Sequence, residues 1–127
     1  MENHKKFEDY YLIIGAGPVG LATAKSLKKS SIPYHQVDAD DEVGGNWYHG
    51  TYKSGHILSA KVAMEYTDFP MSEDLPDFPS SAQMLQYYKD YTKHFDLRSG
   101  IQFNTRVSKV NPIENDLWSV TFEDGNT

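Results

Sequence analysis

The stretch YYLIIGAGPVGLATAKSLKK, residues 10–29, decides the fold. Its residues 10–14 are an apolar run of strand formers, and we expect that strand to be buried on both faces. Glycines follow at once in GAGPVG, residues 15–20. From Pro18 to Lys29 the apolar residues recur at helical spacing, and the lysines at the end suit the negative end of a helix dipole. The pattern predicts a strand, a tight turn and a helix.

A second predicted strand over 32–38 completes one βαβ unit, so the two strands should be parallel. In this context, the GxGxxG pattern of Gly15, Gly17 and Gly20 indicates a dinucleotide-binding turn. The first glycine permits the tight turn, the second allows a pyrophosphate to approach the helix N-terminus, and the third lets helix and strand pack closely. Pro18 fits the first helical turn, where its missing N–H is no loss.

The motif also requires an acid at the end of the second strand, which accepts hydrogen bonds from the ribose hydroxyls. Asp38 stands 18 residues after Gly20 and is our candidate. Asp40, Asp41 and Glu42 are rivals, but we expect them to lie in a solvated loop. Under the alternative interpretation, the glycines form only a structural turn and Asp38 is a loop acid. The agreement of motif and context favours a dinucleotide ligand.

Residues 39–79 show no sustained period, and we expect an extended loop with short strand or turn pieces near His56–Ser59. Inside this loop, Gly44 and Gly45 would allow a second close approach of the backbone to a ligand, with the flat apolar surface of Trp47 beside them. The alternative is a surface turn with Trp47 in the core.

Regular structure returns at Ser80, which forms a predicted capping box with Gln83 at the start of a helix that continues to Phe95. The tyrosines of this helix are expected to pack in the core rather than to bind a cofactor. Two or three further strands are predicted, over 101–103, 106–111 and 118–123. Asp124-Gly125 then indicates a hairpin turn. Because the returning strand is missing, we expect the chain to be part of a larger domain.

Composition excludes several classes of function. The 127 residues carry a net charge of −6 without a Lys/Arg-rich stripe, which argues against a nucleic-acid or anionic-membrane partner. There are no cysteines, and the five histidines show no ligand spacing, so no metal site is expected. The apolar run after Lys5 and Lys6 is similar to a secretion signal, but Glu2, Glu8, Asp9 and the interrupting glycines contradict one. We expect a soluble, cytoplasmic protein of unknown oligomeric state.

The segments GAGPVGLATAKSL, VDADDEVGGNW, YTDFPMSEDLPDFP and IQFNTRVSKV occur in the order and spacing of the flavin-containing monooxygenases and their bacterial relatives. The chain resembles this family from Tyr10 to about Asp124. The tryptophan after the double glycine and the Asp-Phe-Pro element at 68–70 are the most specific features. The resemblance implies an α/β, Rossmann-like FAD/NAD(P)-binding domain of glutathione-reductase type, with a parallel sheet and a β-meander. Residues 1–127 would be its truncated N-terminal part.

The resemblance also implies roles for particular residues. Gly15, Gly17 and Gly20, with Pro18 beside them, would hold the FAD pyrophosphate, and Asp38 the adenosine ribose. Further cofactor-binding positions are Gly45, Asn46 and Trp47, on the path towards the flavin, and Val107, whose backbone would lie near the adenine. In complete members, NADPH reduces FAD, which then oxygenates a nitrogen or sulfur centre of a small-molecule substrate. The NADPH site is expected beyond residue 127, and no catalytic side chain is assigned.

One position departs from the family pattern. Family members commonly place an asparagine beside the flavin in a stretch like YKSxxxNxxK, where this chain has Leu58 within YKSGHILSAK. A polar partner of the flavin is thereby lost, for which His56 or Ser59 would be the substitutes. Leu58 keeps open a flavin-dependent reductase or dehydrogenase-like oxidoreductase without oxygenation. A non-catalytic nucleotide-binding fragment is the other alternative.

Overall fold

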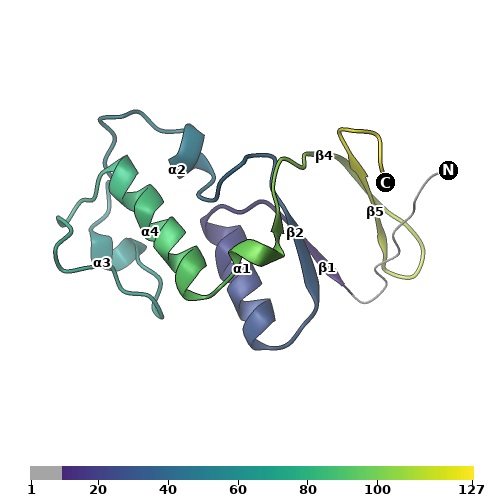
Figure 1. The fold of residues 1–127 in the computed structure, drawn as a ribbon, viewed down its shortest axis with the longest axis horizontal. Helices are drawn as coiled ribbons and strands as arrows, with labels where there is room; N and C mark the ends of the chain where they lie inside the picture. The colour runs from purple at the N-terminus through teal and green to yellow at the C-terminus, as the bar shows by residue number, and fades with distance from the viewer. Residues whose placement is uncertain (1–9) are drawn as a thin grey trace.

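The structure is a computed structural model that describes residues 10–127. The elements follow in the order β1 (Tyr11–Ile14), α1 (Pro18–Lys29), β2 (Tyr34–Val37), α2 (Asn46–His49), α3 (Lys61–Met64), α4 (Ser81–His94), a 3-10 turn (Arg98–Gly100), β3 (Ile101–Gln102), β4 (Val107–Pro112) and β5 (Trp118–Phe122) (Figure 1). Glu2, Glu8 and Asp9, on which the argument against a secretion signal partly depends, lie outside the described residues.

The three strands β1, β2 and β3 form one parallel sheet in the order β1-β2-β3. Tyr11 pairs with Tyr34 at the start of β1 and Ile14 with Val37 at its end, so the predicted βαβ unit is confirmed. Helix α1 lies against this sheet and buries Leu21 completely. Within residues 10–127, no strand pairs with the outer edge of β1.

The expectation that the first strand is buried on both faces is wrong for this chain. Ile13 is 8% exposed, but Tyr11 is 63% and Ile14 55% exposed. Ile13 packs into the core with the residues of α1 and α4. Leu12 and Ile14 instead line an open space between the sheet and the β4–β5 hairpin, so this side of β1 has no close cover.

Residues 39–79 are more ordered than expected. They contain the one-turn helices α2 and α3, and His56 bridges to Ser80 just before α4. Short helices escape a period-based prediction because a single turn holds too few residues to repeat.

Helix α4 begins with the predicted capping box. The Ser80 hydroxyl accepts from the Gln83 N–H at 3.2 Å, and the Gln83 side chain accepts from the Ser80 N–H at 2.9 Å. Tyr87, Tyr88 and Tyr91 are at most 5% exposed, which confirms that the tyrosines pack in the core.

Tyr66 connects helix α4 to helix α1. The ring of Tyr66 lies 4.3 Å from that of Tyr91, between centroids, and its hydroxyl donates to the carbonyl of Pro18. Nearby, Lys25 forms an ion pair with Asp68. The Asp-Phe-Pro region is therefore attached directly to the helix that follows the glycine turn.

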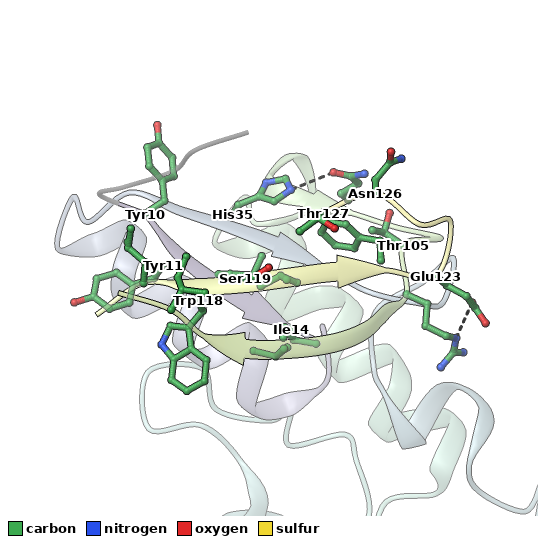
Figure 2. Close-up of a pocket in the computed structure, with 18 of the residues that line it drawn as sticks. Tyr10, Tyr11, Ile14, His35, Thr105, Trp118, Ser119, Glu123, Asn126 and Thr127 are labelled. Carbon is green, nitrogen blue, oxygen red and sulfur yellow. Dashed lines mark hydrogen bonds and ion pairs between the residues drawn. The ribbon is translucent and has the colours of Figure 1, made fainter. Parts of the chain in front are cut away.

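Strands β4 and β5 form a separate antiparallel pair, with Val107 opposite Phe122 and Pro112 opposite Trp118. The chain reverses after β5, where the Gly125 N–H donates to the Phe122 carbonyl, as the Asp-Gly signal predicts. An open cavity of about 1950 Å³ lies between this hairpin and the sheet, with Tyr11, Ile14 and Trp118 around it (Figure 2).

No helix within residues 10–127 has the length and apolarity to cross a membrane.

Candidate functional site

The glycine turn leaves β1 and passes directly over the end of β2. Gly15 has a φ of +108°, a conformation that L side chains rarely adopt. Its N–H donates to the Val37 carbonyl at 2.8 Å, and the next N–H, of Ala16, donates to Asp38 Oδ2 at 2.5 Å. The predicted acid is thus buried against the turn, at 9% exposure.

Gly20 lies in α1 directly beneath this turn. A Cβ on Gly20 would overlap the carbonyl oxygen of Gly15 and lie 2.9 Å from its carbonyl carbon. The third glycine therefore permits the close packing of helix on turn that the motif predicts. Gln36 was not a predicted site residue, yet its side chain donates to the same Gly15 carbonyl at 2.9 Å. In the sequence it is only a polar residue inside a predicted strand.

The two glycine segments meet backbone to backbone. A Cβ on Gly17 would have Gly45 Cα as its nearest neighbour, at 3.5 Å, and a Cβ on Gly45 would lie 3.1 Å from Gly17 Cα. The Gly44 N–H donates to the Ala16 carbonyl at 2.9 Å, which holds the second segment against the first. The structure thus brings together residues that the sequence separates by almost thirty positions.

The N-terminus of α1 opens at this meeting point. Pro18 occupies its first turn, and the helix cap Gly17 supplies no side-chain hydrogen bond. The first N–H groups of a helix have no intrahelical acceptor, and together with the helix dipole they favour an anion. Two glycine segments in backbone contact, beside an uncapped helix N-terminus and a buried acid, fit a binding site for a dinucleotide pyrophosphate and ribose.

The Asp38 carboxylate keeps free acceptor sites for ligand hydrogen bonds. Its Oδ2 accepts from the Ala16 N–H and its Oδ1 from the Asp40 N–H at 2.7 Å. A carboxylate has about four acceptor sites, so two of them remain for hydroxyl donors.

The rival acids Asp40, Asp41 and Glu42 have side-chain partners rather than being merely solvated. Asp40 lies 3.3 Å from His49, and Asp41 accepts from the Tyr48 hydroxyl at 2.6 Å. That hydroxyl lowers the pKa of Asp41. These two contacts attach α2 to the segment that follows Asp38.

Glu42 binds a residue from a distant part of the chain. Its two oxygens accept from the Arg98 guanidinium at 2.6 and 3.2 Å, and this pairing lowers the pKa of Glu42. Arg98 also lies over the ring of Phe103, 5.0 Å from its centroid. The three acids thus serve to shape the loop, which leaves Asp38 as the acid that faces the turn.

Asn46 and Trp47 begin α2, next to the paired glycines. Asn46 is exposed, whereas Trp47 is partly buried and packs against the core. Trp47 therefore takes part in core packing, as the alternative interpretation holds, while remaining adjacent to Gly45.

Val107 opens β4 on the far side of Asp38. The Thr105 N–H donates to the Asp38 carbonyl at 2.8 Å, so Val107 lies two residues beyond a direct contact with the acid.

Leu58 projects into solvent at 97% exposure, and His56 and Ser59 are also exposed. The His56 ring hydrogen bonds to the Phe78 carbonyl at 3.0 Å through Nδ1. The structure thus brings the two glycine segments and Asp38 together. Within the described part of the chain, the segment from His56 to Ser59 forms no hydrogen bond with these residues.

Comparison with known proteins agrees with this geometry. A family model described as FMO-like, flavin-binding monooxygenase-like, matches residues 9–124. The chain is 40% identical over 100 residues to the probable flavin-containing monooxygenase 1 of Arabidopsis thaliana, covering 77% of this chain and 18% of the relative. It is 36% identical over 107 residues to human flavin-containing monooxygenase 1, covering 77% and 20%. The chain therefore spans about a fifth of the length of these relatives.

Solved structures share the fold. The crystal structure of OTEMO in complex with FAD and NADP superimposes with a TM-score of 0.86 at 29% identity. The match covers 96% of this chain and 24% of the solved chain. The predicted Rossmann-like, parallel-sheet architecture is confirmed.

Proposed function

Because the chain belongs to the flavin-binding monooxygenase-like family, we propose that residues 1–127 form the N-terminal part of the FAD-binding domain of a flavoprotein monooxygenase. The observation that carries this proposal is the contact of the two glycine segments beside Asp38. Gly17 and Gly45 face each other with only backbone between them, at the uncapped N-terminus of α1. The fold neighbour OTEMO was solved with FAD and NADP, which supports the same cofactor pair here.

Each residue of the site has a defined task in this proposal. Gly15, Gly17 and Gly20 allow the pyrophosphate to approach the N–H groups at the start of α1, where Pro18 begins the helix. Asp38 accepts hydrogen bonds from the adenosine ribose hydroxyls, and the Val107 backbone lies near the adenine. Gly45, Asn46 and Trp47 line the path towards the flavin ring. Bound FAD supplies the redox chemistry, and these residues bind and orient it.

The activity proposed for the whole protein is NADPH-dependent oxygenation of a nitrogen or sulfur centre in a small molecule, in the cytoplasm. The NADPH site lies outside residues 1–127 in this proposal. Curated relatives of both plant and human origin are named as flavin-containing monooxygenases, which supports the reaction class.

The test of the cofactor assignment is a titration of FAD into a protein that carries this segment at the full length of its relatives, followed by flavin fluorescence. We expect quenching that saturates at one FAD per chain and that is abolished by Gly17→Ala. Unquenched flavin at high chain concentration would contradict the assignment. NADPH consumption with a panel of amines and sulfides tests the reaction, in a protein that carries this segment at the full length of its relatives.

Leu58 supports a second candidate, a flavin-dependent oxidoreductase that does not oxygenate. The side chain at this position is apolar and 97% exposed, so it supplies no polar group to a flavin. Such an enzyme would consume NADPH and release hydrogen peroxide in amounts equal to the NADPH consumed. Oxygenated product from the amine and sulfide panel would exclude this candidate. A Leu58→Asn variant with increased product and reduced peroxide would identify the position as the cause.

A further inference from the structure

One peptide bond of the glycine turn is held from both ends by side chains at the end of β2. The Gly15 carbonyl accepts from Gln36 Nε2, and the Ala16 N–H donates to Asp38 Oδ2. These two groups belong to the same planar trans peptide, in which C=O and N–H point in opposite directions. Gln36 and Asp38 are two positions apart, so their side chains leave the extended chain on the same face. Rotation of this peptide would break both hydrogen bonds at once.

Gln36 makes this contact from a fully buried position. It is 0% exposed, and its Oε1 has no hydrogen-bond partner among residues 10–127. A buried acceptor without a donor lowers stability, and an apolar side chain of the same length would avoid that loss. The side chain also packs under the helix, since a Cβ on Gly20 would lie 3.4 Å from its Nε2. Packing alone therefore favours an apolar residue here, whereas the bond to Gly15 requires a donor.

We propose that Gln36 is a positioning residue for dinucleotide binding. It holds the Gly15–Ala16 peptide in one orientation, and thereby keeps Asp38 and the start of α1 in the arrangement that receives the ribose and the pyrophosphate. Gln36 acts through Gly15 and does not touch the ligand. A turn that is already ordered loses less conformational freedom when the ligand binds. This inference rests on the proposed FAD-binding function.

The test compares Gln36→Met with a matched control, Gln102→Met. Methionine keeps the length of glutamine but removes the donor. Gln102 lies on β3 with an exposed side chain that contacts His35, so the control makes the same substitution in a side chain that has no hydrogen bond to the turn. The probe is ADP, which carries the adenosine and pyrophosphate without the flavin. By calorimetric titration, we expect ADP to bind Gln36→Met about fivefold more weakly than wild type, the loss of one neutral hydrogen bond.

Two further readouts separate positioning from mere structural support. The melting temperature of Gln36→Met should change little, because removal of the unsatisfied Oε1 offsets the loss of the hydrogen bond to the Gly15 carbonyl. The Ala16 amide should exchange with solvent faster in the ligand-free variant, measured by NMR. The control variant Gln102→Met should leave the ADP affinity, the melting temperature and the Ala16 exchange rate unchanged.

Unchanged ADP affinity and unchanged Ala16 exchange in Gln36→Met would overturn the proposal. A fall in melting temperature that parallels the loss of affinity would also overturn it, because it would mark an ordinary structural contact. If a protein that carries this segment at the full length of its relatives binds neither ADP nor FAD, the proposed function itself fails. The Ala16 exchange rate then decides by itself whether Gln36 holds the peptide.

Discussion

Gly17 and Gly45 lie backbone to backbone, so that a Cβ added to either would point at the Cα of the other, at 3.5 and 3.1 Å. The two positions are not equivalent. Gly45 has a φ of +57°, whereas Gly17 has a φ of −81° that any residue can adopt. A side chain at Gly17 is therefore tolerated by the ligand-free fold, so any loss of FAD binding in a Gly17 variant would be an effect on the ligand and not on folding.

We expect Gly17→Ala to abolish FAD binding while the melting temperature of the ligand-free chain changes little, because the added methyl meets Gly45 only at van der Waals distance. Asp38→Ala should weaken FAD binding by a smaller factor, roughly 10- to 150-fold, from loss of charge-assisted hydrogen bonds worth about 1.5–3 kcal/mol. FAD fluorescence titration measures both. Equal and negligible effects would contradict the assignment of the site.

Gly20→Ala should behave in the opposite way. Its methyl would overlap the Gly15 carbonyl oxygen, which is backbone and cannot move without displacing the turn from β2. We expect a loss of about 2 kcal/mol or more in unfolding free energy, as for overpacking in a core. Urea denaturation followed by circular dichroism measures it, with Gly17→Ala as the control. A Gly20→Ala chain as stable as Gly17→Ala would refute the close packing of helix and turn.

The pair between Glu42 and Arg98 should stabilise the chain only where Glu42 is ionised. Arg98 lowers the Glu42 pKa, so this stabilisation is complete above the ordinary value of 4.5 and is lost as the pH falls through the lower, folded value. Arg98→Gln should reduce the unfolding free energy by about 1 kcal/mol at pH 7, since the guanidinium is half exposed. Denaturation at pH 7 and at pH 3 should show that the difference in unfolding free energy between wild type and Arg98→Gln is smaller at pH 3.

Arg106→Gln is the matched control for that experiment. Arg106 approaches Glu123 at 3.5 Å in a pair exposed on both sides, which should contribute little at either pH. If Arg106→Gln lowered the unfolding free energy as much as Arg98→Gln does, the bidentate contact between Arg98 and Glu42 would not stabilise the chain more than an ordinary surface ion pair.

The tyrosine cluster should make the fold sensitive to alkali. Burial raises the pKa of Tyr87 and of Tyr91 to about 12, above the ordinary value of 10.0. Their contribution to stability is therefore complete below pH 10 and is lost as the pH rises towards 12. We expect some tyrosines to ionise together with the loss of helical circular dichroism, in one cooperative step. Ionisation of all nine tyrosines near pH 10 with the helices intact would contradict this.

The exposed edge of β1 should govern the behaviour of the 127-residue chain in solution. Tyr11 and Ile14 are more than half exposed on a strand with an unpaired edge in the described structure, and such edges pair with other chains. We expect the chain to self-associate and to bind FAD weakly. Tyr11→Lys should increase the monomer fraction, measured by light scattering after gel filtration. A monomeric wild-type chain that retains stoichiometric FAD through the column would contradict the prediction.

Local signals in the sequence determined the regular elements. The helix predicted from Pro18 to Lys29 has the same bounds in the structure, because proline and glycine at its start and serines after its end are short-range signals. The capping box of Ser80 and Gln83 likewise involves residues three positions apart. The order of strand, glycines, helix, strand and acid was sufficient to predict a dinucleotide-binding turn.

Only the tertiary structure decided which residues meet. Arg98 reaches Glu42 across 56 positions, and Gly45 meets Gly17 across 28, and no periodicity encodes contacts at such separations. Gln36 is the clearest case, because in the sequence it is one polar residue in a strand. It acquires its bond to Gly15 only when β2 lies parallel to β1 and the turn closes over the end of the strand. Long-range contacts depend on where the folded backbone places each side chain, and that placement is a property of the whole sheet.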